Sequence, residues 1–151
     1  MTANIFHDVA HFHEFAAPYS EMSRFQSDVQ LPPVKQVAHC LALVTEEYSE
    51  LTEASVSREN LPKTADAYLD IMYVCSQGLL SLGLTPEECQ TLWDEVHKAN
   101  RSKVDPSMGL LGENEGRPYI NPSGKIEKPP GFVPPDIEGL LNAFRRARRG
   151  G

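Results

Sequence analysis

The sequence contains little cysteine, no long apolar run and no excess of positive charge. Its three cysteines among 151 residues, Cys40, Cys75 and Cys89, form no CxxC pair and lie in apolar helical patterns. We therefore expect buried, reduced thiols, and neither disulfides nor a zinc site. The apolar runs are much shorter than the roughly 20 residues that cross a bilayer, and the amino terminus lacks the basic region and long apolar core of a signal peptide. These absences predict a soluble, cytoplasmic protein that does not contact membranes.

The shortage of positive charge also bears on nucleic acids. The formal net charge is −7, and general affinity for a phosphate backbone needs a basic surface, so nucleic acid is not an expected partner. The carboxyl-terminal stretch "FRRARRGG" is the exception. Two interpretations of it stay open: cations that complement the carboxyl end of a helix, or a tail that contacts phosphates or nucleic acid.

No strand-like alternation is long enough to build a sheet, whereas helical periodicity recurs. Apolar residues at helical spacing predict four helices, in residues 5–15, 31–54, 61–83 and 85–100. The third is apolar on nearly every side, which is typical of the buried central helix of a bundle. The fourth begins with Thr85 as N-cap and has a glutamate three residues later, a pattern that predicts a capping box.

The amino-acid composition changes in residues 104–135, which hold most of the prolines and half of the glycines. We expect a long loop there, followed by a last helix at about residues 136–149. The length suits one domain over residues 1–151, with a helical core at about 4–103. The predicted fold class is all-α: a small bundle of about four to five helices with a long, Pro/Gly-rich carboxyl-terminal loop, assembling as an oligomer.

Four glutamates, Glu46, Glu47, Glu50 and Glu53, crowd the second predicted helix. Glu46, Glu50 and Glu53 share one face, and Glu47 lies beside it. One interpretation is a solvated acidic face opposite an apolar seam. The other is a metal site, because like charges four residues apart repel and no lysine or arginine occurs from residue 36 to 57 to relieve them.

Asp66 and Asp70 stand one helical turn apart in "DAYLDIMYVC", an otherwise apolar stretch. A buried ionised carboxylate needs a counter-charge, a proton or a metal ion. If the second and third helices pack antiparallel, as their short connection favours, the aspartates meet the glutamates. Carboxylate oxygens without histidine or cysteine are hard ligands that select Mg²⁺ or Mn²⁺ over zinc. We interpret Asp70 as a metal ligand.

A site that handles phosphates also needs cations. The candidates, from "VHKANRSK" and "GKIEK", are Lys98, Asn100, Arg101, Lys103, Lys125 and Lys128. For Lys98 and Arg101 a simple role at the carboxyl end of a helix stays open. His7 and His11, four residues apart, have no third ligand motif nearby, so we interpret them as ordinary surface or packing histidines.

These motifs resemble those of the all-α nucleoside triphosphate pyrophosphohydrolases, the MazG-like group. The EExxE motif of that family reads "EEYSE" here, and its second acidic motif, usually ExxD, reads "DAYLD". Asp70 matches the more constant aspartate, while the spacing of Asp66 departs from the pattern. Short phage and bacterial members called phosphoribosyl-ATP pyrophosphohydrolase-like carry DAxxD, a segment like "EVHKANRSK" and an ending near "KPPGFVPPDI". All three occur here in order, over about residues 8–140, with Arg101 where many members have methionine.

The resemblance implies Mg²⁺- or Mn²⁺-dependent hydrolysis of a nucleoside triphosphate between the α and β phosphates, usually in dimers or tetramers that complete each site. It implies Glu47, Glu50 and Asp70 as metal ligands, and Glu46 and Asp66 as further ligands or as the base that orients water. For catalysis we expect Glu46, Glu47, Glu50 and Asp70; for the metal, Glu47, Glu50, Asp66 and Asp70; for the substrate, Lys98, Asn100, Lys103 and Lys128.

The substrate itself stays open. The phage subgroup called MazZ, which prefers dGTP and supplies dGMP to a modified-purine pathway, is one placement for the chain, in which case the protein acts in the host cytoplasm. Phosphoribosyl-ATP and a damaged nucleotide are alternatives with the same chemistry. A non-enzymatic acidic bundle that binds a partner protein is the alternative without chemistry.

Overall fold

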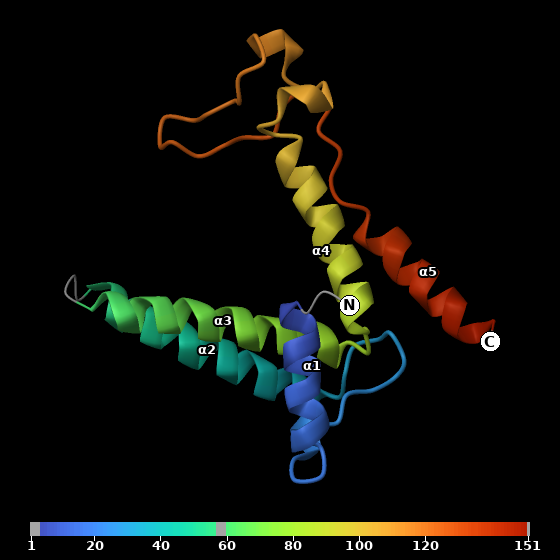
Figure 1. The fold of residues 1–151 in the computed structure, drawn as a ribbon. Coiled ribbons are helices and arrows are strands. Elements are labelled where there is room, and N and C mark those ends of the chain that lie inside the picture. The colour runs from blue at the N-terminus through green and yellow to red at the C-terminus, as the bar shows by residue number, and fades with distance from the viewer. Residues whose placement is uncertain (1–3, 57–59, 151) are drawn as a thin grey trace. The chain divides into compact units, whose positions relative to one another are not determined.

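The computed structural model describes residues 4–56 and 60–150, and within them the chain is all-helical (Figure 1). These ranges hold five α-helices and no strand: α1 (Ile5–Ala16), α2 (Val34–Val56), α3 (Leu61–Ser81), α4 (Pro86–Arg101) and α5 (Ile137–Arg149). The predicted all-α class and number of helices are confirmed. In the same ranges no single helix is long and apolar enough to cross a membrane, although α3 and α4 taken together across a bend meet those criteria.

Local side chains fix where several helices begin. At α4 the N–H of Thr85 donates to the Glu88 carboxylate at 2.9 Å, and the N–H of Glu88 donates to the Thr85 hydroxyl at 3.2 Å, which is the predicted capping box. At α1 the Asn4 side chain accepts from the N–H of His7 at 3.1 Å. Such caps satisfy N–H groups that have no partner within the helix, so these boundaries follow from local sequence.

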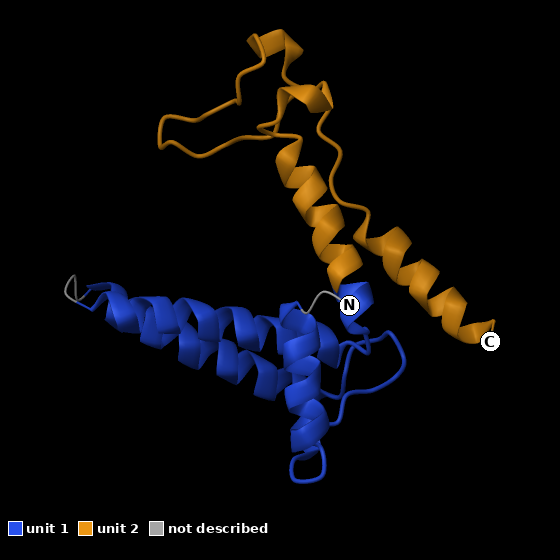
Figure 2. Cartoon of the chain, viewed as in Figure 1, with its two compact units in different colours: residues 1–89, 151 blue, residues 90–150 orange. Residues whose placement is uncertain are grey.

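The chain forms two compact units, residues 1–89 and residues 90–150 (Figure 2). The boundary falls within α4, whose first residues belong to the first unit. The single domain predicted over residues 1–151 stays a prediction.

In the first unit, α2 and α3 lie side by side as a helical hairpin, and α1 packs across α3 (Figure 1). The core under this crossing is apolar: Phe6 and Val9 of α1 and Val74 and Leu80 of α3 are buried. Burial of such side chains stabilises by about 1.5–3 kcal/mol each. The apolar periodicity of the sequence therefore anchors α3 against its neighbours at the end that leads to α4.

Gly83 ends α3 where a larger residue does not fit. Its φ of +83° lies in the left-handed region, and a Cβ built on it would stand 2.0 Å from the backbone oxygen of Asp28. The segment that precedes α2 is also tied here, because the N–H of Gln30 donates to the carbonyl of Leu82 at 3.1 Å. The glycine thus permits both the turn and the close approach of a second segment.

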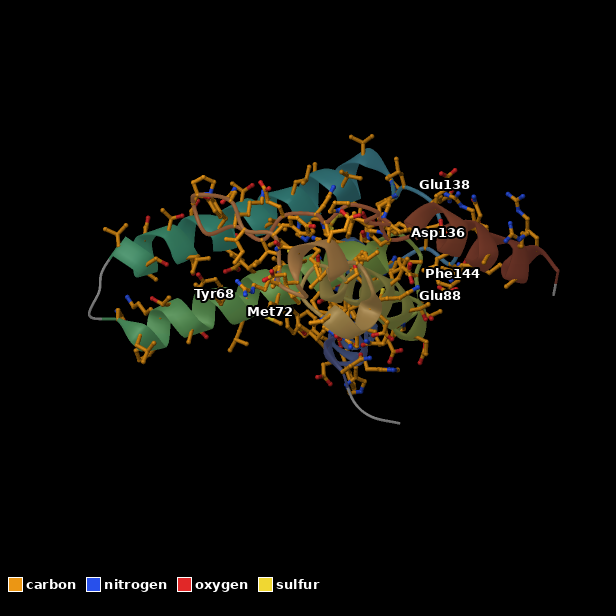
Figure 3. All side chains as sticks on the ribbon, turned by 90° about the horizontal axis from the view of Figure 1, so that it is seen from above. Tyr68, Met72, Glu88, Asp136, Glu138 and Phe144 are labelled. Atoms are coloured by element: carbon orange, nitrogen blue, oxygen red, sulfur yellow. The ribbon has the colours of Figure 1, made fainter. Side chains whose placement is uncertain are left out.

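The expectation that α3 is buried on nearly every side is wrong within one chain. Tyr68, Leu69 and Met72 are 56%, 62% and 52% exposed, and Figure 3 labels Tyr68 and Met72, which lie one turn apart on the same face. Leu41 and Tyr48 of α2 are also more than half exposed. The physical reason is that α2 and α1 are the only described elements in substantial contact with α3, and they cover one side of it.

The cysteines are free, and they differ in environment. Cys89 is buried, and burial raises the pKa of its thiol to about 12. Cys40 is half-buried, whereas Cys75 is exposed, so the expectation of buried thiols is wrong for Cys75. Cys75 lies seven residues after Tyr68, on the uncovered face of α3.

The second unit contains most of α4, the loop through residues 102–136 and the amphipathic α5. The loop is ordered by short-range contacts: two 3-10 turns, η2 (Pro106–Met108) and η3 (Gly112–Asn114), and one isolated bridge between Ile120 and Ile126. Leu111 is fully buried within it. The segment that composition marks as a loop therefore contains a fully buried apolar side chain.

Candidate active site

The α2–α3 hairpin gathers the predicted acidic residues. The pKa of the Glu47 carboxyl is raised, first by burial and then by the negative charges of Asp70, Glu50, Glu46 and Asp66. Two of these neighbours, Glu46 and Glu50, belong to α2 as Glu47 does, while Asp66 and Asp70 belong to α3. The expected antiparallel pairing of the two helices thus brings all five carboxylates into one electrostatic cluster, which we call the carboxylate cluster.

Glu47 contributes a buried carboxylate oxygen to this cluster. Its Oε2 atom is buried from solvent and has no hydrogen-bond partner among the described residues. A carboxylate oxygen in that position is satisfied by a proton or a cation, because an unpaired buried charge is costly. Nearby carboxylates disfavour a second negative charge and favour a positive ion at the same place.

The donor chemistry of the cluster fits Mg²⁺ or Mn²⁺. All five side chains offer oxygen, the ligand that these ions prefer, and the unpartnered Glu47 oxygen is a vacant acceptor. In residues 4–56 and 60–150, however, no three Asp, Glu, His or Cys side chains lie close enough together to form a complete set of metal ligands. The assignment of Glu47, Glu50, Asp66 and Asp70 as metal ligands therefore stays a prediction.

A cavity of about 530 Å³ adjoins the cluster between α2 and α3. Its described lining residues are Glu50, Glu53, Ala54, Asn60, Lys63, Asp66 and Ala67. It is of the size that nucleotide-like ligands occupy, and it shares Glu50 and Asp66 with the cluster. Sequence reasoning missed Asn60 and Lys63 as site residues, although the first-turn position of Lys63, three residues before Asp66, carried the signal.

In the second unit, two predicted substrate-binding lysines converge on one aromatic ring. The Nζ atoms of Lys103 and Lys128 lie 5.2 and 5.3 Å from the centroid of Phe132. Lys103 also donates to the Asn100 side chain at 2.7 Å. Asn100, Lys103 and Lys128 are thus held together, and Phe132, which sequence reasoning did not single out, holds them. We call these four residues the lysine cluster.

The other predicted cations have local partners. Lys98 lies 3.4 Å from the Glu95 carboxylate on its own helix. Arg101 forms an ion pair with Asp105, and hydrogen bonds from Ser107 and Arg101 hold the pKa of the Asp105 carboxyl at about 2. These pairs favour the structural interpretation of Lys98 and Arg101 over direct contact with a ligand.

The amino-terminal histidines have ordinary surroundings. His7 Nε2 lies 3.3 Å from Glu87. The ring of His11 meets Phe15 edge to face, with centroids 4.8 Å apart. The sequence interpretation treats both as packing and surface residues, and these contacts agree with it.

Residues 22–100 match the model of the family described as phosphoribosyl-ATP pyrophosphohydrolase. The matched span is more than half of the chain and contains α2, α3 and nearly all of α4, and with them the whole carboxylate cluster. No curated protein matches the chain. Three members of the lysine cluster lie beyond the matched span.

Proposed function

Because the chain belongs to the phosphoribosyl-ATP pyrophosphohydrolase family, within the MazG-like all-α NTP pyrophosphohydrolases, we propose that it hydrolyses a nucleoside or deoxynucleoside triphosphate, GTP or dGTP foremost. Family membership makes it a pyrophosphohydrolase that acts on a nucleotide. The proposed bond is the one between the α and β phosphates, and the products are a nucleoside monophosphate and pyrophosphate. The observation that carries the proposal is the buried, unpartnered Oε2 atom of Glu47, which lies among four other carboxylates contributed by two helices.

The proposed mechanism assigns Glu47, Glu50, Asp66 and Asp70 to hold Mg²⁺ or Mn²⁺. When bound, such an ion neutralises polyphosphate charge and makes a bound water more acidic. Glu46 accepts a hydrogen bond from the attacking water and aligns it with the bond that breaks. The water oxygen bonds to the α phosphorus and its proton passes to Glu46, while the bond from the α phosphorus to the bridging oxygen breaks and that oxygen leaves with the β phosphate.

We assign the lysine cluster to the polyphosphate. Lys103 and Lys128 present two positive charges within about the same distance of one ring, and Asn100 fixes the first of them. Positive charge beside the leaving pyrophosphate stabilises the transition state, where negative charge grows on that group.

We also propose a homo-oligomer, a dimer or a tetramer. The uncovered faces of α2 and α3 carry Leu41, Tyr48, Tyr68 and Met72, each more than half exposed. Large apolar side chains left exposed on two paired helices are typical of an interface that a second helical pair covers. Light scattering at assay concentration tests this proposal, and an active monomer would contradict it.

Phosphoribosyl-ATP is the second candidate substrate, because the matching family is described by that activity. It undergoes the same bond cleavage, so the carboxylate cluster does not distinguish it from a nucleoside triphosphate. A substrate panel does. A damaged nucleotide belongs in the same panel.

The decisive experiment is chromatographic product analysis after incubation of the purified protein with each NTP, each dNTP and phosphoribosyl-ATP, with Mg²⁺ or Mn²⁺. We expect monophosphate and pyrophosphate in equal amounts, and loss of both in Glu47→Gln. Glu113→Gln, a change of the same chemistry at an exposed loop position, is the matched control and should retain activity. Orthophosphate as the first product would overturn the proposed bond cleavage.

A further inference from the structure

The cavity between α2 and α3 extends beyond the carboxylate cluster toward the connection of the two helices. Glu53 lies one turn after Glu50 on α2, and Asn60 lies six residues before Asp66 at the start of α3. At about 1.5 Å of rise per residue, these two residues stand one to two turns further along the hairpin than the shared lining residues do. Glu53 and Asn60 therefore line the end of the cavity that lies toward the connection of the two helices, away from Asp70.

The helix cap fixes which end of the Asn60 amide is free. Its Oδ1 atom accepts from the N–H of Lys63 at 3.3 Å and thereby caps α3. An amide has one carbonyl oxygen and one NH₂ group, so the NH₂ group is the end available to a ligand. Asn60 therefore offers the cavity a hydrogen-bond donor.

Glu53 offers the opposite chemistry. An ionised carboxylate has two acceptor oxygens and no donor. Glu53 lines the same cavity as Asn60, and none of the ion pairs among the described residues involves it. The described residues at this end of the cavity thus offer an amide donor from Asn60 and a pair of acceptors from Glu53, and the ammonium of Lys63, three residues before Asp66, is a further donor.

We propose that Glu53 and Asn60 read the base of the nucleotide and select guanine. The Watson–Crick edge of guanine carries one acceptor, O6, followed by two neighbouring donors, N1–H and the N2 amino group. The Asn60 NH₂ group matches O6, and the two Glu53 oxygens match the two donors. This inference rests on the proposed function, which it deepens by naming the residues that select the base.

The other bases do not match this arrangement. Adenine and cytosine present a ring nitrogen acceptor where the carboxylate expects a donor, and their amino groups face the Asn60 donor. Uracil and thymine offer a single N–H between two carbonyls, so that one Glu53 oxygen meets a carbonyl oxygen. A polar group left without its partner in a binding site strongly disfavours the analogue that lacks it.

The pair GTP and ITP tests the proposal most directly, because ITP lacks only the N2 amino group. For the wild type we expect kcat/KM for GTP to exceed that for ITP by roughly 10- to 100-fold, the size of a bidentate base contact. In Glu53→Gln one acceptor becomes a donor, so this ratio should fall toward one. In Asn60→Asp the cap acceptor remains but the donor is lost, so kcat/KM for GTP should fall while the melting temperature is unchanged. Glu113→Gln is the control and should keep the wild-type ratio.

Three results separate the inference from the function on which it rests. If the wild type cleaves several nucleotides without preferring GTP to ITP, or if both variants keep the wild-type ratio, the base-reading role is wrong and the function stands. A drop of equal size for all four bases in Glu53→Gln also overturns it, because the cavity then holds phosphates. If no nucleotide is cleaved, the function fails, and calorimetric binding of GTP and ITP analogues with a methylene group between the α and β phosphorus atoms decides the base contact by itself.

Discussion

Replacement of Asp70 by asparagine separates a metal-binding role from a structural one. The change keeps the shape of the side chain and removes the charge that, among its neighbours, most raises the pKa of Glu47. Without metal, this relieves repulsion within the carboxylate cluster, so the variant should be as stable as the wild type or more stable. With metal, it removes a charged ligand, so turnover should fall by orders of magnitude.

The expected size follows from binding linkage. An ion present at a hundred times its dissociation constant stabilises the native state by about 2.7 kcal/mol. If the loss of one ligand weakens binding a hundredfold, the same ion concentration stabilises the variant by about 0.4 kcal/mol. For a chain of this size, the shift in melting temperature on adding Mg²⁺ should then shrink from about 5–10 °C to about 1 °C.

The assay consists of thermal melts of both proteins with and without Mg²⁺, beside one turnover measurement. Asp28→Asn, an exposed change of the same chemistry in the loop before α2, controls for the loss of a charge. A structural Asp70 held by hydrogen bonds predicts the reverse pattern: a loss of about 1.5–3 kcal/mol without metal and no response to Mg²⁺. A destabilised, metal-indifferent but active Asp70→Asn protein would refute the reasoning.

Three further predictions concern other parts of the chain. Gly83→Ala places a Cβ 2.0 Å from the Asp28 oxygen at a positive φ, so the midpoint of urea unfolding should fall markedly; an unchanged midpoint would contradict the described turn. Burial lowers the pKa of His13 below its ordinary value of 6.5, so that on acidification the unfolded chain takes up this proton at a higher pH than the folded chain does. The free energy of unfolding should therefore fall as the pH is lowered from 7.5 to 5.5, and it should fall less in His13→Gln. Lys103→Gln with Lys128→Gln should lower kcat/KM for a triphosphate by about 100- to 1,000-fold, the loss that removal of one transition-state donor typically causes, and leave the melting temperature unchanged.

Much of the fold was predictable because its signals are local. The capping box of Thr85 and Glu88 involves residues three apart, and it forms as the sequence indicates. The meeting of the carboxylates needed only helical periodicity and a short connection. Even the pairing of Lys98 with Glu95 lies within one helical turn, where sequence spacing alone suggests it.

The rest depended on contacts that spacing does not encode. An apolar face on a helix predicts that the face is buried, but it does not distinguish burial within the same chain from burial against another chain. The sequence therefore did not predict the exposure of Tyr68 and Met72 within one chain. Phe132 contacts Lys103 and Lys128 from a loop, and a loop sequence has no helical or strand periodicity from which such a contact could be predicted. The cavity wall at Asn60 exists because two helix ends meet, a property of the pair and of neither segment alone.

The proposed homo-oligomer would make protein concentration a variable of folding. If a second copy covers Tyr68 and Met72, part of the apolar burial of the hairpin is intermolecular, and folding and association become coupled. The melting temperature then rises with the logarithm of total protein, and refolding contains a second-order phase that accelerates as the chain is concentrated. Cys75, on the same face of α3, reports this step as a thiol that reacts more slowly at high concentration than after dilution.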